Sequence, residues 1–355
     1  MKKIFLFSIA GCLVFSSCHK NNDNKTTAVT ESQVITDFVG KVALPQYQTL
    51  QDRATDLNNA ILALNTTAND VNLVAAQNAW RSVRSTWEGC EGFLVGPVED
   101  DNYDPNMDTW PVDYLQLDSF MTSSSEGDIN TATVSTLGQS LRGFHPLEYI
   151  LWGVNGNATA AGLTAKDKKY MVALAQDVLT TCTALNTSWA TSGGNFQSQF
   201  LTAGTGSTRY TTKKDALLAL AAGMADICGE VGGGKMLDPY DLRDSTKTES
   251  PFSHNSMTDF TNNIKGAQNV YLCSIGGVSG NSLSNLVAQK NLSLDNKIKS
   301  QFAAAVAALG NVTVSFESAL YTQRTQLQTA MTAINDLQGT LDGELKTFIT
   351  TYVKD

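Results

Sequence analysis

Histidine is rare in this chain, so the few that occur point to the residues that could perform chemistry. There are three among 355 residues, and one of them, His19, lies close to the N-terminus. His145 stands three residues before Glu148, so on a helix the imidazole and the carboxylate would share one face. Both groups are common metal ligands, but two ligands alone do not make a site. The pair is a candidate metal site, with His254 as the candidate third ligand.

The same spacing also has a purely structural interpretation. Pro146 favours the first turn of a helix, which would make His145 an N-cap-like residue. Glu148 would then stand where a capping glutamate reaches back to the N-cap backbone N–H. On spacing alone the cap is the favoured interpretation, and metal ligation is the alternative.

A second segment places an arginine on a stripe of tryptophans. Trp80, Arg84 and Trp87 recur at helical spacing. Tryptophans on such a stripe usually belong to the core, so Arg84 must stack on a ring or pair with a buried carboxylate. Because Glu88 and Glu91 lie within reach on the same helix, the segment predicts an ion pair at Arg84.

The most acidic stretch of the chain, residues 96–118, has side-chain oxygens at alternate positions: Asp100, Asn102, Asp104, Asn106 and Asp108. This spacing resembles a calcium loop. Pro105 and Pro111, however, occupy the places of the glycine and the bidentate glutamate of an EF-hand loop. Calcium bound by Asp100, Asn102 and Asp104 is therefore the lesser alternative, and turn formation is the favoured explanation.

The N-terminus has the order of an export signal. Two lysines precede an apolar run that is too short to cross a bilayer, and Cys18 with a polar segment follows it. We therefore expect a signal peptide over 1–17, and a lipidated Cys18 with a flexible tether over 18–30. Cys12 is a rival anchor, but apolar residues follow it where a tether belongs. The expected location is the cell envelope, with the membrane as a partner through the lipid.

Beyond the tether, apolar residues recur at helical spacing through most of the chain. The expected helices cover 35–64 with a division at Pro45, 71–93, a segment approaching 141–148, 171–189, 216–231 and 316–348. Glycine, serine and threonine dominate 192–212, which suggests a domain boundary. The sequence predicts an all-α fold of two tandem helical bundles, an N-terminal domain over 31–195 and a C-terminal domain over 196–355. The four remaining cysteines are expected to be buried thiols.

The run from Arg142 to Leu151 contains Gly143, His145 and Glu148, and it closely resembles the Gly-x-His-x-x-Glu signature of the imelysin family. These are bacterial envelope proteins classed among peptidases and linked to iron uptake. Further motifs occur in the order expected of that family: Trp80-Arg81 with Trp87, Gly96-Pro97, Trp110-Pro111, Glu230 with Lys235, and the stretch Glu249–Ser256.

The resemblance covers nearly the whole mature chain. It implies two bundle-like helical domains, with the signature near their junction and lining a cleft. It extends directly to Gly143, His145 and Glu148, and less directly to Ser253 and His254.

Three functions remain open. The first is metal-related binding or uptake, with iron as the expected divalent metal ahead of zinc and calcium, and with an outer-membrane uptake partner. The second is a metallopeptidase, and the third is a non-catalytic protein that binds a peptide or glycan. Hydrolysis at zinc ordinarily needs three protein ligands and an open coordination position for water. A chain with so few histidines does not readily supply such a set, whereas iron tolerates carboxylate-rich sites. A net charge of −9 with scattered basic residues argues against nucleic acid as a partner.

Overall fold

The computed structural model describes residues 28–354. Helices account for 74% of the described residues, which confirms the all-α prediction. The predicted signal peptide, Cys12, Cys18, His19 and most of the tether lie outside the described residues.

The helices before residue 212 are α1 (Glu31–Phe38), α2 (Leu44–Thr66), α3 (Asp70–Cys90), α4 (Pro97–Asp100), α5 (Tyr103–Met107), α6 (Tyr114–Ser123), α7 (Thr131–Val134), α8 (Phe144–Trp152), α9 (Ala165–Trp189) and α10 (Gln197–Leu201). Those after it are α11 (Lys213–Glu230), α12 (Leu237–Leu242), α13 (Ser256–Leu272), α14 (Leu283–Ala288), α15 (Leu292–Gly310), α16 (Phe316–Thr322), α17 (Arg324–Gly339) and α18 (Lys346–Tyr352). A small antiparallel hairpin of β1 (Ser274–Ile275) and β2 (Val278–Ser279) follows α13.

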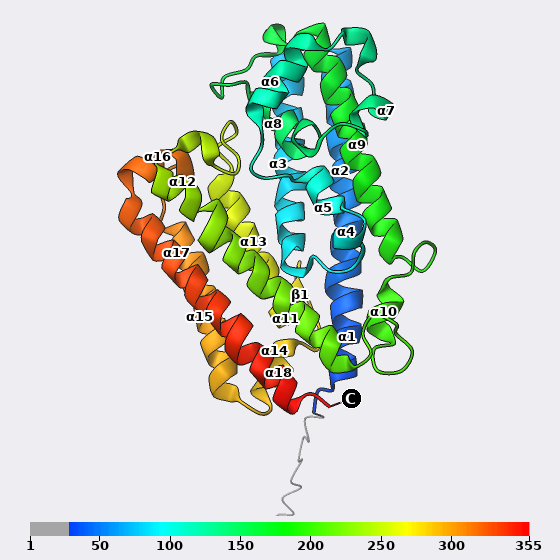
Figure 1. The fold of residues 1–355 in the computed structure, drawn as a ribbon, viewed down its shortest axis with the longest axis vertical. Coiled ribbons are helices and arrows are strands. Elements are labelled where there is room, and N and C mark those ends of the chain that lie inside the picture. Colours follow the sequence, from blue (N-terminus) through cyan, green and yellow to red (C-terminus); the bar gives the residue numbers. More distant parts are fainter. Residues whose placement is uncertain (1–27, 355) are drawn as a thin grey trace, which may run out of the picture.

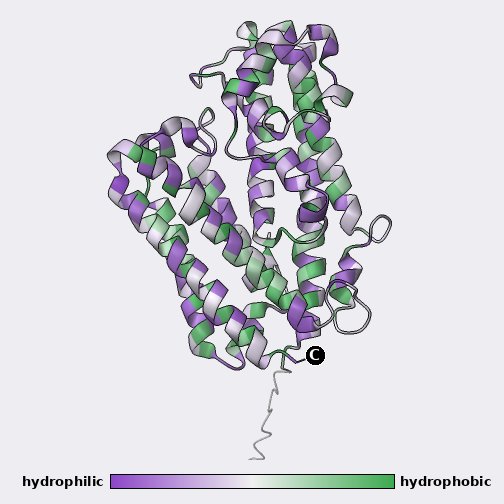
Figure 2. Ribbon diagram, viewed as in Figure 1, coloured by the Kyte–Doolittle hydropathy of each residue, from purple (hydrophilic) through white to green (hydrophobic). Residues whose placement is uncertain are grey.

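The long helices form two groups that lie side by side. In Figure 1, α2, α3 and α9 run together in one group, and α11, α13, α15 and α17 make up the other. The groups meet where α3 packs against α13. Hydrophobic and hydrophilic residues alternate along these ribbons in Figure 2, as expected of amphipathic helices. One hydrophobic core is continuous through both groups, and a domain boundary at residues 195/196 stays a prediction.

Local sequence signals explain where the long helices begin. Thr164 and Thr212 each form a capping box with an aspartate three residues later, at the starts of α9 and α11. Asn69 caps α3. The predicted division near Pro45 is confirmed, because a π-helical turn (Val39–Ala43) separates α1 from α2 and the proline lies in the first turn of α2.

The expected C-terminal helix over 316–348 is not continuous. Its apolar stripe is buried as predicted, but the helix breaks at Gln323 and passes through a π-helical turn at Thr340–Leu345. Gly339 and Gly343 lie at this turn, where glycine weakens the regular α-helical conformation. The apolar residues are therefore buried at the predicted spacing, although the helix that carries them is interrupted. Periodicity alone did not predict these interruptions.

The stretch Lys213–Leu242, which joins α11 to α12 through the π-helical turn Val231–Lys235, is long and apolar enough to cross a membrane by length and composition. Its most apolar window is 61% buried, as in the core helix of a folded domain. The prediction of buried thiols is confirmed, because the four cysteines of the described part, Cys90, Cys182, Cys228 and Cys273, are free and buried.

Candidate metal centre

The signature segment begins helix α8 in a way that the sequence did not indicate. Gly143 is the N-cap residue, with φ +83°, and no side chain caps the helix. The capping interpretation of the histidine–glutamate pair is therefore wrong. Glu148 Oε1 instead accepts hydrogen bonds from the backbone N–H of Ser253 at 2.8 Å, from the backbone N–H of Phe252 at 3.2 Å and from Ser253 Oγ at 2.7 Å. The carboxylate thus fastens the loop between the short turn at 245–247 and α13 onto α8.

The imidazole of His145 points into a buried acidic pocket. Nε2 lies 3.1 Å from Asp108 Oδ1 and 3.8 Å from Glu249 Oε1, while Nδ1 lies 3.8 Å from Glu148 Oε2. The side chain is only 2% exposed, and neither ring nitrogen has a hydrogen-bond partner among the described residues. Ligand atoms of Asp108, His145 and Glu249 all lie within 4.8 Å of one another. One imidazole and two carboxylates form a donor set that suits iron, manganese or zinc.

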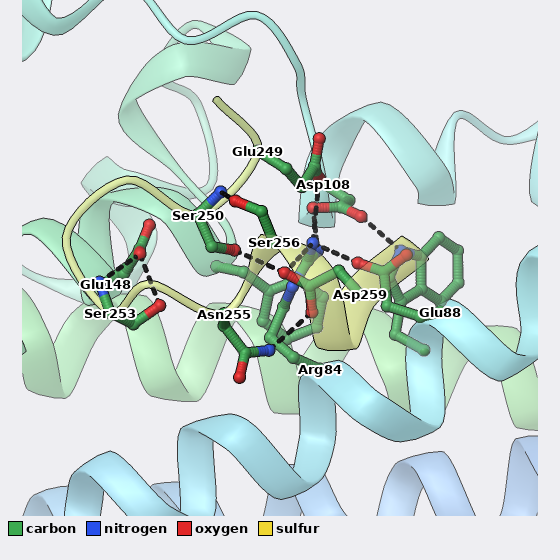
Figure 3. Close-up of polar contacts among 12 residues, drawn as sticks. Arg84, Glu88, Asp108, Glu148, Glu249, Ser250, Ser253, Asn255, Ser256 and Asp259 are labelled. Atoms are coloured by element: carbon green, nitrogen blue, oxygen red, sulfur yellow. Dashed lines mark hydrogen bonds and ion pairs between the residues drawn. The ribbon is translucent and has the colours of Figure 1, made fainter. Parts of the chain in front are cut away.

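Arg84 lies at the middle of this pocket (Figure 3). Its guanidinium pairs with Glu88 and Asp108, and Nη2 lies 2.9 Å from Glu249 Oε1 and 4.0 Å from Asp259 Oδ2. All of these side chains are buried. The predicted ion pair at Arg84 is confirmed, and it extends to carboxylates that α3 does not supply.

The two tryptophans of the stripe hold the parts of the pocket together. Trp80 Nε1 donates to the carbonyl oxygen of Phe144 at 2.9 Å, which ties α3 to the start of α8. Trp87 Nε1 donates to Asp108 Oδ2 at 2.7 Å. Both rings are fully buried, so these residues belong to the core as predicted and also position the polar site.

A second buried basic residue, Lys235, lies beside the acids of the pocket. Lys235, at the end of the π-helical turn Val231–Lys235, places Nζ 3.3 Å from Glu230 Oε1, 3.5 Å from Glu249 Oε1 and 3.6 Å from Glu91 Oε2. Burial alone would lower its pKa, but the surrounding carboxylates hold the pKa well above its ordinary value. The ammonium is therefore charged.

Carboxylates outnumber cations in this interior. The buried acids are Glu88, Glu91, Asp108, Glu148, Glu249 and Asp259. Opposite them stand Arg84, Lys235 and His145. Unpaired buried charge is costly, so the surplus must be neutralised by protons or by a bound cation.

Burial raises the pKa values of several of these groups, so protons neutralise part of the surplus charge. Burial raises the pKa of Glu88 to about 8 against the opposing effect of Arg84, and burial raises that of Asp259 to about 6. Burial and the neighbouring Glu88 raise the pKa of Glu91 well above its usual range. For His145, burial would lower the pKa, but the carboxylates of Asp108 and Glu148 raise it to about 9.

Asp108 differs from Glu88, Glu91 and Asp259. Burial would raise its pKa, but the Arg84 guanidinium and the imidazole hold it well below the usual range. Asp108 therefore stays ionised beside His145, as a metal ligand must be.

The other predicted ligands lie elsewhere. His254 adopts φ +55°, exposes about half of its side chain, and places Nδ1 2.9 Å from Glu317 Oε2. In the buried group of potential metal ligands, the partners of His145 are Asp108 and Glu249, whereas the sequence analysis predicted Glu148 and His254. His254 is nevertheless close in the chain to Ser253, which binds Glu148.

The calcium alternative finds no support in the geometry. Its segment folds into the short helices α4 and α5, with Asn102 in a left-handed conformation between them. Asp100 pairs with Arg209 at 2.6 Å on the surface. Asp104 is partly buried, and burial raises its pKa to about 7.

Sequence reasoning missed several residues of the site. Glu249, Asp259 and Asn263 carried no local signal, and Asp108 was noted only within the acidic alternation. The stretch Glu249–Ser256 was the one available clue, because it belonged to the family resemblance. Arg142, which directly precedes the signature, forms a two-point pair with Asp177 outside the pocket, at 3.0 and 2.9 Å.

A cavity of about 470 Å³ lies next to the buried pocket. Its walls come from residues 110–115 and 246–248. The first segment begins two residues after Asp108, and the second ends at the residue before Glu249. Two of the three candidate ligands are therefore close in the chain to residues that line the cavity. No residue of the signature lines this cavity, so a cleft at the signature stays a prediction.

Comparison with known proteins agrees with this architecture. The imelysin family model matches residues 43–342. Iron-regulated protein A of Synechococcus elongatus is 31% identical over 337 residues, covering 94% of this chain and 89% of that protein. A crystal structure described as an iron-regulated protein A precursor from Parabacteroides distasonis superposes with a TM-score of 0.81 at 25% identity, covering 91% of this chain and 96% of that one.

An imelysin-like protein from Psychrobacter arcticum shares the fold, with a TM-score of 0.75 at 12% identity and coverage of 92% of this chain and 97% of that one. The family match spans both groups of helices and includes His145 together with both of its acidic neighbours. On the match of sequence and fold along almost its whole length, this chain belongs to the imelysin family.

Proposed function

We propose that this protein binds a divalent metal, with iron as its physiological ion, at a centre formed by Asp108, His145 and Glu249. The observation that carries the proposal is the convergence of these three ligands in a buried pocket where carboxylates outnumber cations. His145 has no hydrogen-bond partner at either ring nitrogen, and Glu249 Oε2 has none either. Buried polar atoms are normally satisfied, and a cation bound between His145 Nε2 and Glu249 would satisfy the unpartnered atoms that face it.

The geometry assigns the two imidazole nitrogens different roles. Nε2 faces Asp108 and Glu249, so it is the nitrogen that would bind the metal. Nδ1 faces Glu148, which would orient the ring from behind, as carboxylates commonly do for metal-bound histidine. The signature glutamate is therefore a positioning residue in this proposal, and it also holds the loop that carries Glu249.

Iron is preferred for two reasons. A set of one imidazole and two carboxylates suits a cation that tolerates oxygen-rich ligation. In addition, the relative in Synechococcus elongatus is named an iron-regulated protein. Binding is also favoured over peptidase activity, because Asp108, His145 and Glu249 are at most 7% exposed and a peptide bond would need direct access to the metal.

We further infer that the protein works in the cell envelope, anchored through a lipid on Cys18 and close to an outer-membrane uptake partner. The order of charged start, apolar run and cysteine supports this location. Cys18→Ser should move the protein from the membrane fraction to the soluble fraction. Cys12→Ser is the control, and release by that variant alone would contradict the choice of anchor.

The metal proposal is tested by comparing His145→Ala with His254→Ala. Protein purified without chelator should contain metal, and His145→Ala should lose it while His254→Ala retains it. Added Fe(II), kept anaerobic, should raise the free energy of unfolding of the wild type by about 2.7 kcal/mol at 100 times the dissociation constant. This increment should vanish in His145→Ala. Equal metal contents and equal increments in both variants would rule out the centre.

A further inference from the structure

Lys235 shares a carboxylate oxygen with the proposed metal centre. Its Nζ lies 3.5 Å from Glu249 Oε1, and the same oxygen lies 3.8 Å from His145 Nε2, the nitrogen assigned to the metal. The lysine side chain is only 2% exposed. A dication held by His145 and Glu249 would therefore have this ammonium as a close neighbour, and like charges repel strongly where little water screens them. The metal and the ammonium compete for one oxygen.

The contacts that hold the ammonium are long. Nζ lies 3.3 Å from Glu230 Oε1, 3.5 Å from Glu249 Oε1 and 3.6 Å from Glu91 Oε2. Charge-assisted hydrogen bonds between an ammonium and a carboxylate measure about 2.7–2.9 Å. Arg84, the other cation beside Glu249, reaches Oε1 at 2.9 Å and extends from the regular helix α3. Of these two cations, Lys235 is therefore the one that leaves Glu249 at the lower cost.

One of the three acidic partners of Lys235 leads to the surface. The side chain of Glu230 is 50% exposed, whereas those of Glu91 and Glu249 are buried. Glu230 ends α11 and directly precedes the π-helical turn that carries Lys235. An ammonium that leaves Glu249 can therefore keep Glu230 as its partner while it moves toward water.

The turn that carries Lys235 contains three consecutive glycines. Gly232 packs closely, because an added Cβ would lie 2.4 Å from Asn335 Oδ1. Gly233 and Gly234 have no such reason to be glycine: no atom of the described residues lies within 4 Å of a Cβ added to either, and neither has a positive φ. Glycine weakens a helix relative to alanine, and π-helical turns occur frequently at functional sites. The two glycines therefore leave this turn easy to rearrange.

We propose that Lys235 sets the metal affinity of the centre, because a divalent metal bound by His145 and Glu249 displaces its ammonium from Glu249 toward Glu230 and the surface. The inference rests on the proposed function of the centre. Before metal binds, the ammonium offsets part of the charge of the buried carboxylates, and the metal takes over this role when it binds. The turn Val231–Lys235 rearranges as the side chain moves.

The test measures whether Lys235 becomes accessible when metal binds. The full chain is stripped with chelator and treated with an amine-acetylating reagent, with and without saturating Mn(II), and each modified lysine is quantified by peptide mass spectrometry. Mn(II) should raise the acetylation rate of Lys235 at least about tenfold, because reactivity follows the population of open conformers. In His145→Ala, Mn(II) should leave Lys235 protected. Lys166 is the control lysine, since it is partly buried and donates to the carbonyl oxygen of Met121 at 2.8 Å, outside the pocket, and its rate should not change.

Two substitutions test the effect on affinity. Lys235→Met keeps an apolar stem but removes the charge, so calorimetry should show Mn(II) binding at least about tenfold tighter than in the wild type. Gly234→Ala stiffens the turn and should weaken Mn(II) binding several-fold. Gly343→Ala is its matched control, because Gly343 also lies in a π-helical turn, Thr340–Leu345, and no described atom lies within 4 Å of its added Cβ. This variant should bind Mn(II) as the wild type does.

The failures of the two proposals are distinguishable. Mn(II) bound by the wild type without a rise in Lys235 acetylation would overturn the displacement and leave the metal centre intact. An affinity of Lys235→Met no higher than that of the wild type would overturn it in the same way. If Lys235→Met does not fold, Gly234→Ala and Gly343→Ala decide, and equal affinities in that pair would overturn the inference. A wild type that binds no Mn(II) would overturn the proposed centre itself, and this inference with it.

Discussion

At the scale of single residues, Arg84 is the side chain on which the acidic interior depends. One fully buried guanidinium faces acids from the end of α3, the end of α5, the loop before α13 and α13 itself. Each of these acids would be expensive to bury alone, because the medium around it screens charge poorly. The arginine therefore makes the folded interior possible before any metal is present.

Replacing this arginine should be severe. Arg84→Met keeps an apolar stem but leaves Glu88, Asp108 and Glu249 without their shared partner, and removal of one partner from a buried ion pair costs about 3–5 kcal/mol. Urea denaturation in chelator should show this loss. Arg53→Met is the control, because Arg53 pairs with Asp56 on the surface and such pairs are worth about 0–1 kcal/mol. Similar losses in the two variants would contradict the central role of Arg84.

Part of this site could be predicted from the sequence and the rest could not, for a physical reason. Arg84 and Glu88 are one helical turn apart, so local spacing was sufficient to predict their pairing. Glu148 binds Ser253, which lies 105 residues away, and Arg84 binds Glu249, which lies 165 residues away. Spacing within one helix carries no information about such partners, and the local alternative, a cap on α8, therefore looked more convincing than it was.

At the scale of elements, the close contact of α3 with α13 brings Asp259 and Asn263 to the pocket. Two glycines make the contact: a Cβ on Gly266 would lie 2.6 Å from the carbonyl oxygen of Gly89, and a Cβ on Gly92 would lie 2.7 Å from the backbone nitrogen of Ala267. These distances allow no side chain without movement of a helix. The distance between α3 and α13 is therefore set by contact between their backbones and not by interlocking side chains.

Gly266→Ala should accordingly destabilise the protein, although glycine to alanine inside a helix normally gains up to about 1 kcal/mol. We expect a loss of about 1–3 kcal/mol, the usual range for overpacking, and a weaker retention of metal. Gly339→Ala serves as the control, because nothing lies within 4 Å of its added Cβ, and it should be neutral or stabilising. Chemical denaturation and metal analysis of both variants provide the measurements. A stable Gly266→Ala with full metal content would show that the contact is not needed.

Helix periodicity predicted α3, which carries Arg84 and Glu88, but it did not predict α13, which carries Asp259 and Asn263. The expected segments 71–93 and 171–189 correspond to α3 with its following turn and to α9. The tight approach at Gly266 was not predictable, because a glycine in a helix has the same local signature whether or not another backbone touches it. The same applies to Gly143, where a Cβ would lie 2.1 Å from the carbonyl oxygen of Met107.

At the scale of the whole molecule, the buried protons couple stability to pH. The folded-state pKa is raised from 6.5 to about 9 for His145 and from 4.5 to about 8 for Glu88. Both groups hold their protons more tightly in the folded state, so the stability they contribute is complete below their unfolded pKa values. It is lost as pH rises through about 8 and 9.

In chelator, the melting temperature should therefore fall between pH 6.5 and pH 9. Glu88→Gln should show a smaller fall, because the glutamine carries no proton to lose. Metal affinity should change in the opposite direction and increase over the same range, since protons compete with the metal for these ligands. A melting temperature that is constant or rises with pH in chelator would contradict the assigned protonation.

The distance along the chain between the ligands also determines when the centre can exist. Asp108 and His145 belong to the first group of helices and Glu249 to the loop before α13, so all three ligands meet only when both groups have packed. An ion that interacts only with the finished arrangement should leave the refolding rate unchanged and slow unfolding by the whole of its stabilisation. For such an ion, binding would be the last event in the maturation of the protein. Its release would require the buried pocket to open, so the lifetime of the complex would depend on the opening rate of the fold.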